Sequence, residues 1–599
     1  MGLCRLDEPG TILEILQIRA SDEPDGLLYS FLASPHTTTT LTYGQLLKKV
    51  KTFAGMLQER SGQHERAILV YPPGLDFIVA LFGCMAAGLV PIPVYPRFGT
   101  RLERSLERIQ HVATDADCRL ILTTEQLLPE IGPNPSVNSL RFTCLATNDL
   151  SEAAGWDADL CLPEPESLAY LQYTSGSTKL PRGVKITHRN AVTNSAALCD
   201  CYSLDRESRF VVWIPPYHDM GLIIGIFLPL VAGFPVTLMA PYTFVQNPAI
   251  WLETMSQTHA TGTVSPNFGY ELCVRKMSDE AVARLDLSQW RVAMNGAEPV
   301  SPATMERFAG KFSPAGFRKS VFCPSYGLAE ATLLVAASVG TEPQVRAFDR
   351  SLLESGCVQV CAENQDNARL LVGHGKPGPS IGLRIVNPAT REACPDGQVG
   401  EIWVSGSGVA QGYQNKHELS RQIFQAYLAD TGEGPFLRTG DLGFVLDGQL
   451  YIAGRIKDLI IVAGRKHFPE DLEQCVRESH PAFRGMPGAV FSVELEGQEE
   501  VVVLQKINRR LTAGVREEDL FRAVQRALSQ DNIKADAIVL VKAGTIPRTT
   551  SGKVQRHQCR RDFLARKVKG WAQWMSPRFM RAVQKSPQVN RVLRMSQSG

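Results

Sequence analysis

The stretch that decides the fold is Tyr173-Thr174-Ser175-Gly176-Ser177-Thr178-Lys179-Leu180-Pro181-Arg182-Gly183-Val184. Apolar runs on either side of it predict two strands, so its hydroxyls, glycines and cations form the turn between them. Hydroxyls and free backbone N–H groups in such a turn point into one concavity that suits phosphate oxygens. The two cations add charge-assisted hydrogen bonds. The stretch therefore predicts a phosphate-binding loop rather than a flexible linker.

Two familiar nucleotide-binding motifs do not match this chain. A P-loop has Gly directly before its Lys-Ser/Thr pair, whereas Lys179 follows Thr178. The run at 373–378 has Rossmann glycine spacing, but Pro377 favours a turn over the start of a helix. The phosphate chemistry must therefore be identified from the rest of the chain.

Length and composition narrow the class of protein. A chain of 599 residues is too long to fold around a single hydrophobic core, so two or three domains are expected. The 63 basic and 61 acidic residues nearly cancel, which gives no field for nucleic acid. Fourteen scattered cysteines, without paired C-x-x-C motifs, favour neither a zinc site nor a disulfide framework. With no apolar signal region at the N-terminus, we expect a reduced, cytoplasmic protein that binds no nucleic acid.

Two uncharged runs, 222–240 and 78–95, approach the length of a membrane span. Pro229 and a Gly-Phe-Pro turn at 233–235 interrupt the first run, and Gly88 and two prolines interrupt the second. Both patterns predict a buried helix followed by a strand. We expect no transmembrane segment.

Strand and helix patterns alternate from about residue 40 to residue 330, which predicts a mostly parallel sheet. Thr42 is a candidate cap for a helix that runs to Arg60, and Ala67 begins a buried strand. Residues 385–452 differ, because short strands separated by Gly/Asp turns predict a smaller β-rich subdomain. A final α/β segment runs to about residue 565.

Polar residues follow several of the expected strands. The strand at 211–214 ends in two prolines and exposes Tyr217, His218 and Asp219, at the strand end where open α/β sheets bind ligands. Later strands end in small-residue turns that carry Glu298 and Glu330. Each glutamate alone could be an ordinary helix N-terminal acid. Their repetition predicts one cleft with room for a flat ring and a metal-binding carboxylate.

Taken together, these stretches resemble the adenylate-forming superfamily of acyl-CoA synthetases, luciferases and adenylation domains of peptide synthetases. The resemblance spans about residues 40–565. Within the superfamily the chain is most similar to the fatty acyl-AMP ligases, through residues 217–222, 290–299 and 326–332. It implies an α/β fold with a large N-terminal domain at 1–456, built from two α/β sheet subdomains and a small β-rich subdomain. A small mobile α/β C-terminal domain is expected at 457–566.

The resemblance also implies substrates and site residues. ATP, Mg²⁺ and a fatty acid would bind, with Glu330 as the Mg²⁺ ligand. Lys553 would bridge the acyl carboxylate and the α-phosphate, His218 would border the acyl pocket, and Lys457 would be the hinge between the domains. The loop at 174–183 would hold phosphates, 296–298 and Tyr326 the adenine, and Asp441 with Arg455 the ribose. The full implied nucleotide-binding set is Thr174, Ser175, Gly176, Ser177, Thr178, Lys179, Arg182, Gly183, Gly296, Ala297, Glu298, Tyr326, Gly327, Leu328, Ala329, Glu330, Asp441 and Arg455.

The chain departs from the common superfamily pattern at three positions. Lys179 stands where many relatives have Gly, and Arg182 replaces the usual Lys. A guanidinium still binds phosphate, so activity is expected to survive. Ala329 stands where many members have a phosphate-bonding Thr, and acyl-AMP ligases often have Ala there.

The acyl acceptor is the open question. Forty-four residues separate Glu330 from Gly375, and the surplus at about 345–371 resembles an insertion that restrains C-terminal domain movement in acyl-AMP ligases and disfavours CoA. An expanded surface loop is the other interpretation. We expect transfer to the phosphopantetheine thiol of a separate acyl carrier protein, since no carrier-like segment follows residue 565. The alternatives are an acyl-CoA synthetase and an inactive adenylate-binding protein.

The C-terminal end is strongly basic. From Lys553 to Gly599 it contains twelve Lys and Arg residues and one acid, Asp562. We interpret 567–599 as a basic tail, in which Trp571, Trp574 and other apolar residues are interleaved with the cations. It could be solvated, could contact an anionic membrane peripherally, or could steer an acidic carrier protein.

Overall fold

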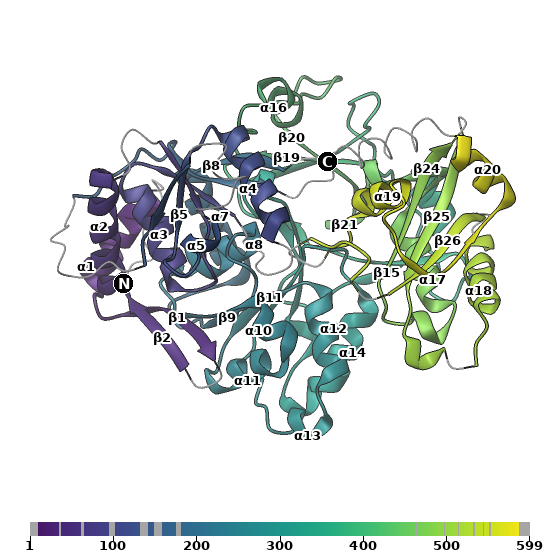
Figure 1. Ribbon diagram of the computed structural model, residues 1–599, viewed down its shortest axis with the longest axis horizontal. Coiled ribbons are helices and arrows are strands. Elements are labelled where there is room, and N and C mark those ends of the chain that lie inside the picture. The colour runs from purple at the N-terminus through teal and green to yellow at the C-terminus, as the bar shows by residue number, and fades with distance from the viewer. Residues whose placement is uncertain are drawn as a thin grey trace.

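Figure 1 shows the fold as a computed structural model. The structure describes residues 10–34, 37–60, 65–94, 102–131, 142–148, 159–174, 181–462, 465–495, 498–512, 514–530, 533–542, 544–549 and 553–585.

Helix α1 (Ile12–Asp22) starts at a Thr11–Glu14 capping box. Strands β1 (Leu27–Ser34) and β2 (Thr37–Thr42) follow, and Thr42 caps α2 (Tyr43–Arg60) as expected, because the Gln45 amide donates to its hydroxyl at 3.2 Å.

The first subdomain is a four-stranded parallel sheet in the order β4-β3-β5-β6. Its strands are β3 (Arg66–Leu69), β4 (Val90–Pro93), β5 (Leu120–Thr123) and β6 (Thr143–Ala146), and its helices are α3 (Leu75–Ala86), α4 (Leu102–Ala116) and α5 (Leu128–Ile131). The hairpin of β7 (Leu168–Thr174) and β8 (Arg182–Thr187) adjoins β4. Thr174 pairs with Arg182 across this hairpin, so the two strands expected on either side of the loop are confirmed.

The second subdomain is a nine-stranded sheet in the order β17-β14-β13-β12-β11-β9-β10-β1-β2, with six parallel strands at its centre. Its further strands are β9 (Phe210–Val212), β10 (Val236–Met239), β11 (Gly262–Ser265), β12 (Val292–Asn295), β13 (Phe322–Gly327), β14 (Leu334–Ala337) and β17 (Lys376–Pro377). Its helices include α7 (His188–Tyr202), α10 (Pro241–Gln246), α11 (Ala249–Gln257), α12 (Asn267–Lys276), α13 (Asp279–Val282) and α14 (Pro302–Phe312). Because parallel strands end at one edge, residues 213–219, 295–298 and 326–330 lie together there.

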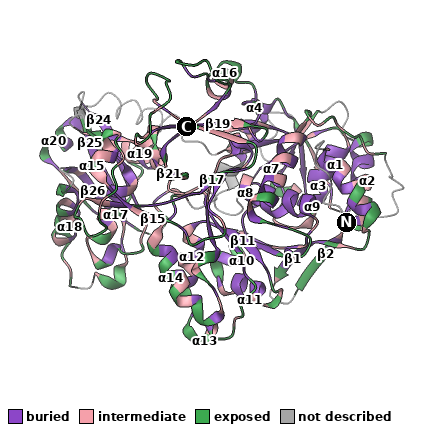
Figure 2. Cartoon of the chain, turned by 180° about the vertical axis from the view of Figure 1, so that it is seen from behind, coloured by how far each residue is buried: buried purple, intermediate pink, exposed green. Residues whose placement is uncertain are grey.

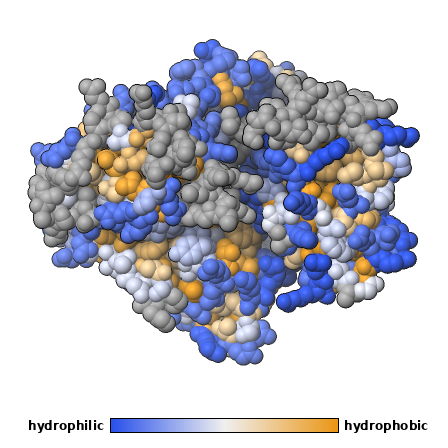
Figure 3. All heavy atoms as spheres, in the orientation of Figure 1, coloured by the Kyte–Doolittle hydropathy of each residue, from blue (hydrophilic) through white to orange (hydrophobic). Residues whose placement is uncertain are grey.

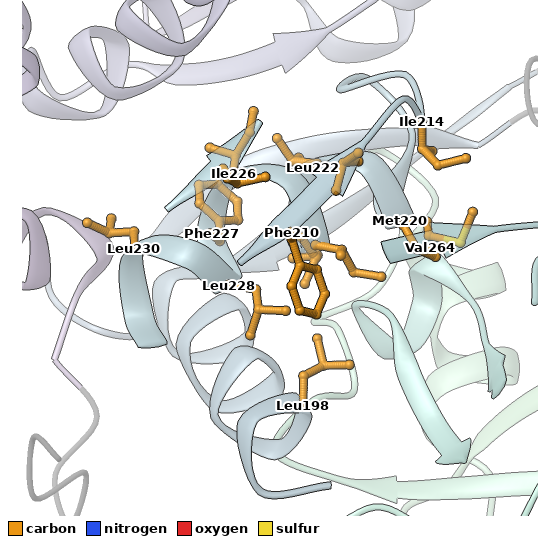
Figure 4. Packing of buried hydrophobic residues seen from close by; sticks show 14 of the residues in the cluster. Leu198, Phe210, Ile214, Met220, Leu222, Ile226, Phe227, Leu228, Leu230 and Val264 are labelled. Carbon is orange, nitrogen blue, oxygen red and sulfur yellow. The ribbon is translucent and has the colours of Figure 1, made fainter. Parts of the chain in front are cut away.

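The first uncharged run is a buried helix followed by a strand, as its pattern predicts. Segments α8 (Asp219–Leu222), a π-helical turn (Ile223–Phe227) and α9 (Leu228–Ala232) follow one another and lead to β10. Figure 4 shows Ile226, Phe227 and Leu228 from this helix among other buried apolar side chains, which include Phe210 and Leu198. Within the described residues, no helix is both long and apolar enough to cross a membrane.

The β-rich subdomain is an antiparallel sheet of β18 (Ile381–Val386), β19 (Gly400–Gly406), β20 (Leu437–Leu446) and β21 (Gln449–Arg455), with α16 (His417–Phe424) beside it. The surplus region forms β15 (Val345–Asp349), α15 (Arg350–Ser355) and β16 (Ala368–Val372). Phe348 is fully buried, and its ring lies 5.1 Å from that of Phe444 and 5.2 Å from that of Tyr451. The insertion is therefore a packed element and not a loose surface loop.

The C-terminal domain follows a 3₁₀ turn at Ile456–Asp458 and has its own buried core. It contains β22 (Ile460–Val462), β23 (Arg465–His467), α17 (Pro469–Glu478), β24 (Gly488–Leu495), β25 (Gln498–Lys506), α18 (Glu517–Ser529), β26 (Ala535–Val541), α19 (Arg556–Leu564), β27 (Gly570–Met575) and α20 (Pro577–Lys585). Helix α18 buries Leu520, Val524 and Leu528 on one side. Its outer side is exposed in Figure 2 and lies along the hydrophilic edge of Figure 3.

The interpretation of 567–599 as a basic tail is wrong for the residues described up to 585. Strand β27 pairs with β26, from Ala537↔Met575 to Val541↔Gly570. Trp571 and Trp574 pack against the domain core, and Phe579 of α20 is fully buried. The interleaved aromatics are thus the inward faces of a strand and a helix. The domain continues past the boundary expected at residue 566, and residues 586–599 lie outside the described part.

Candidate active site

A cavity of about 470 Å³ lies where the two sheet subdomains, the β-rich subdomain and the C-terminal domain meet. Most of the expected site residues line it: Thr174, Arg182, His218, Gly296, Ala297, Tyr326, Gly327, Leu328, Ala329, Glu330, Asp441, Arg455, Lys457 and Lys553. Gly183 and Glu298 are not in the lining. Five further residues of the expected nucleotide-binding set lie outside the described part of the chain: Ser175, Gly176, Ser177, Thr178 and Lys179.

Apolar side chains from several elements contribute to the cavity lining. They are Leu198 of α7, Met220 and Ile224 of the helix after β9, Val264 of β11 and Leu334 of β14. Figure 4 shows Leu198, Met220 and Val264 coming from these separate elements. The remaining lining carries carboxylates, guanidiniums and an ammonium group. Such a cavity suits a ligand with an apolar chain and a charged end.

Hydrogen bonds fix the β7–β8 hairpin, whose connection is the expected phosphate-binding loop. The Tyr173 hydroxyl donates to Oδ2 of Asp115 at 2.9 Å, and Nζ of Lys416 lies 2.7 Å from Oδ1 of the same residue. A Cβ atom at Gly183 would lie 2.8 Å from the Tyr173 ring, so glycine permits this close approach. Asp115 therefore joins α4, the hairpin and the loop before α16.

Glu330 lies beside an aromatic residue that sequence reasoning missed. The Tyr413 hydroxyl donates to Oε1 of Glu330 at 2.7 Å, and the Arg182 guanidinium lies 5.3 Å from the Tyr413 ring centre. Burial and then the Glu330 charge raise the pKa of Tyr413, which keeps the hydroxyl a donor. Mg²⁺ in nucleotide sites commonly takes one or two protein carboxylates besides phosphates. An oriented Glu330 carboxylate in the cavity lining fits that need.

Asp441 is held by two partners within the cavity. The Tyr326 hydroxyl donates to its Oδ2 at 2.8 Å, and Nε of Arg455 lies 2.9 Å from its Oδ1. Asp441 raises the pKa of Arg455 as the largest influence, so the guanidinium stays charged. The expected adenine-site tyrosine and the expected ribose pair are thus one connected group.

A buried glutamate fixes the turn that presents Asp441. Glu401 accepts hydrogen bonds from Trp403 Nε1 at 2.9 Å, from Arg438 Nη2 at 2.8 Å and from the Gly440 amide at 3.1 Å. Gly440 has φ +73°, which favours glycine. Sequence reasoning missed Glu401. The signal that could have identified it was a charged residue inside an otherwise apolar strand.

Lys553 reaches the cavity from a loop of the C-terminal domain. Burial, and then repulsion from Arg455, lowers its pKa, while Asp219, Asp441 and Glu298 oppose this shift. For Asp219, burial alone would raise the pKa, but His218, the Met220 amide and Lys553 outweigh it and the pKa is lowered. The lysine therefore lies among anions from three separate segments of the N-terminal part.

His218 and Glu298 have supporting positions as well as possible ligand contacts. Nδ1 of His218 lies 2.5 Å from Oδ1 of Asp219, and the His218 side chain caps α8. Glu298 accepts from the Phe268 amide at 3.0 Å, and burial raises its pKa despite nearby Arg548 and Lys553. His218 lines the cavity, whereas Glu298 is not among its lining residues.

Arg556 anchors the segment that follows Lys553. Its guanidinium donates to both oxygens of Glu473 at 2.7 and 2.9 Å and to Asp458 at 3.1 Å, and it pairs with Glu470 at 2.8 Å. Asp458 directly follows the expected hinge residue Lys457. One arginine thus connects the lysine loop, α17 and the expected hinge, a link that the sequence did not reveal.

The insertion contacts the C-terminal domain through ion pairs. Nε of Arg369 lies 2.8 Å from Oδ1 of Asp471, its guanidinium lies 4.5 Å from the Phe468 ring centre, and His467 Nδ1 lies 3.0 Å from Glu354. Burial raises the pKa of Asp471 to about 6, against the opposing charge of Arg369. These contacts join the two parts in the arrangement that places Lys553 in the cavity.

Comparison with known proteins agrees with this geometry. Residues 16–414 match the family described as AMP-binding enzyme, and residues 457–573 match the AMP domain of Disco-interacting protein 2-like proteins. The chain is 39% identical over 572 residues to the medium-chain-fatty-acid–[acyl-carrier-protein] ligase JamA of Moorena producens, which covers 94% of this chain and 97% of the relative.

Two solved structures extend the comparison. One comes from a study of fatty acyl-adenylate ligases from E. coli and L. pneumophila, with a TM-score of 0.83 and 31% identity over 93% of this chain and 98% of that chain. The other is a fatty acyl-adenylate ligase from L. pneumophila in complex with acyl adenylate and pyrophosphate, with a TM-score of 0.72 and 32% identity over 94% and 98% of the two chains. The expected fold class is confirmed, and the chain belongs to the AMP-binding enzyme family, as an adenylate-forming ligase.

Proposed function

We propose that the protein activates a fatty acid with ATP to acyl-AMP and pyrophosphate, and then passes the acyl group to the phosphopantetheine thiol of a separate acyl carrier protein. The observation that carries this proposal is the single cavity whose lining combines apolar side chains with Glu330, Asp441, Arg455 and Lys553. The names of the fatty-acid ligases described above support the substrate class.

In the first half-reaction, a fatty carboxylate oxygen attacks the α-phosphorus of ATP, and the bond to the pyrophosphate leaving group breaks. Both reactants are anions, so positioning and charge neutralisation lower the barrier. Lys553 would lie between the carboxylate and the α-phosphate. Asp441 would accept hydrogen bonds from the ribose hydroxyls beside Arg455, with Tyr326 and the 296–297 turn against the adenine.

The phosphate end would be held by the 174–183 loop and Arg182. Mg²⁺, bound by Glu330 and the ATP phosphates, would supply charge neutralisation for the leaving pyrophosphate. Tyr413 would orient Glu330 for that contact, since its hydroxyl already fixes Oε1. The apolar lining residues would hold the acyl chain, with His218 at its border.

In the second half-reaction, the carrier thiolate attacks the acyl carbonyl, a thioester forms and AMP leaves. Lys553 must withdraw to admit the thiol, which requires the C-terminal domain to move. We place the domain boundary and hinge at Lys457, in the 3₁₀ turn between β21 and β22. The contacts of Arg369 and Glu354 with the C-terminal domain would limit this movement and disfavour CoA.

The test is product analysis. The enzyme is incubated with ATP, Mg²⁺, mixed fatty acids, CoA and a phosphopantetheinylated carrier, and acyl-AMP, acyl-CoA and acyl-carrier are measured by mass spectrometry. Abundant acyl-CoA would favour the acyl-CoA synthetase alternative, and absence of ATP–pyrophosphate exchange with any acid would favour an inactive protein. We also place the reaction in the cytoplasm, which the thirteen free cysteines of the described part support.

A further inference from the structure

A second cleft lies between α12 and the C-terminal domain, and its volume is about 300 Å³. Figures 1 and 2 both show α12 and α14 at the side of the N-terminal part that faces this domain. Four cations line the cleft: Arg275 of α12, Lys506 at the end of β25, Lys542 after β26, and Arg548 on the loop that leads to Lys553. We call these four residues and their surroundings the basic cleft.

The positive charge of the basic cleft is not balanced by its own lining. Its acidic lining residue, Glu271, is paired with Arg307 at 2.9 Å. Among the residues that the structure describes, none of the four cations has a side-chain hydrogen bond or ion pair. Arg484, Arg509 and Arg510 are exposed nearby on the turns that connect with β24 and α18.

Three of the four cations, Arg275, Lys506 and Arg548, repel one another across the domain boundary. Burial, then Arg275 and Arg548, lowers the pKa of Lys506. Burial likewise lowers the pKa of Arg548, with Arg477 and Arg275 adding to the shift while Glu298 opposes it. Like charges held together in a partly desolvated cleft are stabilised by an anionic partner. The basic cleft therefore fits a negatively charged partner.

We propose that the basic cleft is the docking surface for the acidic face of the acyl carrier protein. The inference rests on the proposed function, because it names where that function's second substrate first binds. A carrier is typically acidic and presents a phosphodiester at the root of its thiol arm, so its charge complements the cleft. Arg548 lies on the same loop as Lys553, so a carrier docked in the basic cleft would contact the loop that must withdraw before thiol transfer.

We assign electrostatic steering of the carrier to the basic cleft instead of to a basic tail. Residues 570–585 are folded into the C-terminal sheet and its covering helix, so they do not form a free arm. Steering by fixed charges mainly raises the association rate and weakens as salt screens the charges. The basic cleft should therefore affect carrier loading at low salt and leave adenylation unchanged.

The test uses the variants Arg275→Glu and Lys542→Glu, singly and together, because both side chains are exposed and remote from the proposed chemistry. Loading of the phosphopantetheinylated carrier is measured as kcat/KM at low and high salt, beside ATP–pyrophosphate exchange. We expect the double variant to lose about 10- to 100-fold in kcat/KM at low salt. The loss should shrink at high salt, and exchange should match the parent enzyme.

Arg391→Glu is the matched control for each single variant, since Arg391 is an exposed arginine in the β-rich subdomain and the change in charge is the same. An equal loss in this control would show an effect of net charge alone and overturn the docking surface. Parent-like loading by the double variant at low salt would overturn it too. A parent enzyme that forms acyl-AMP but loads no carrier would instead refute the proposed acceptor, and the docking surface with it.

Discussion

The hydroxyl of Tyr413 donates a hydrogen bond of 2.7 Å to Oε1 of Glu330, although 82 residues separate the two in the chain. This bond orients the carboxylate proposed to bind Mg²⁺, while Arg182 lies against the same aromatic ring. A hydrogen bond to a charged group contributes about 1.5–3 kcal/mol. Tyr413 thus connects the β7–β8 hairpin, which we expect to bind phosphate, with the proposed metal ligand.

Tyr413→Phe should weaken the use of Mg²⁺, because the ring and its contact with Arg182 remain while the bond to Glu330 is lost. We expect acyl-AMP formation to fall about 10- to 100-fold at limiting Mg²⁺, with partial recovery at high Mg²⁺. The measurement is the rate of ATP–pyrophosphate exchange against Mg²⁺ concentration. Tyr427→Phe is the control, since Tyr427 is 52% exposed. A Tyr413→Phe variant with an unchanged Mg²⁺ profile would show that the bond has no such role.

Deprotonation of Lys553 should cause the fall of the adenylation rate at high pH. Burial lowers its pKa, so its ammonium group loses its charge at a lower pH than an ordinary lysine. If the charged form neutralises the reacting anions, activity is retained below this pKa and declines as pH rises through it. The pH profile of kcat/KM for acyl-AMP formation measures this decline in the free enzyme.

Lys553→Ala should reduce acyl-AMP formation by about 100-fold or more and change ATP affinity little. In Lys553→Arg the alkaline decline should move to higher pH, because guanidinium keeps its charge. Calorimetric ATP binding provides the control measurement. Normal acyl-AMP formation by the alanine variant would mean that another residue acts at this position.

Lys457→Pro should impair thioester formation more than adenylation. Proline fixes φ and would restrict the backbone rotation expected of a hinge. Single-turnover measurement of the two half-reactions separates the effects. Lys457→Ala is the control, because it removes the side chain from the cavity and leaves the backbone free. Equal losses in both half-reactions of the proline variant would argue against a hinge at this residue.

Arg369→Gln should increase the use of CoA several-fold, since it removes the ion pair between the insertion and Asp471. Acyl-AMP formation should stay near the parent rate. The measurement is the ratio of acyl-CoA to acyl-AMP at fixed CoA. Arg346→Gln is the control within the same insertion, because Arg346 pairs with Asp447 of the β-rich subdomain instead. If both variants behave alike, the link to the C-terminal domain does not govern acceptor choice.

The sequence predicted the site best where residues follow strands. Glu330 follows β13, one of the central parallel strands whose ends meet at one edge of the sheet. Asp441 and Arg455 stand in short motifs on β20 and β21, and the antiparallel pairing of these two strands sets them opposite each other. The segments around Thr174 and Arg182 were also placed correctly, because apolar strands flank the loop on both sides. These local patterns could be recognised before any tertiary contact was known.

Contacts that depend on tertiary packing could not be predicted. Tyr413 stands in an irregular segment without a motif, and Arg556 finds its acidic partners on a helix some eighty residues earlier. The C-terminal strand and helix were misread because the stretch that contains them, from Lys553 to Gly599, has twelve cations and one acid. Phe579 and Ala582 are both buried on α20. Their spacing of three residues in the sequence is the helical pattern that the many cations obscured.

The measurement that tests the central claim most directly is a competition between acceptors. The enzyme is supplied with ATP, Mg²⁺ and a fatty acid, together with CoA and a phosphopantetheinylated carrier at equal concentrations, and the products are resolved by mass spectrometry. The account predicts acyl-AMP and acyl-carrier, with little acyl-CoA. Acyl-CoA as the dominant product, or a carrier left unloaded while acyl-AMP accumulates, would contradict it.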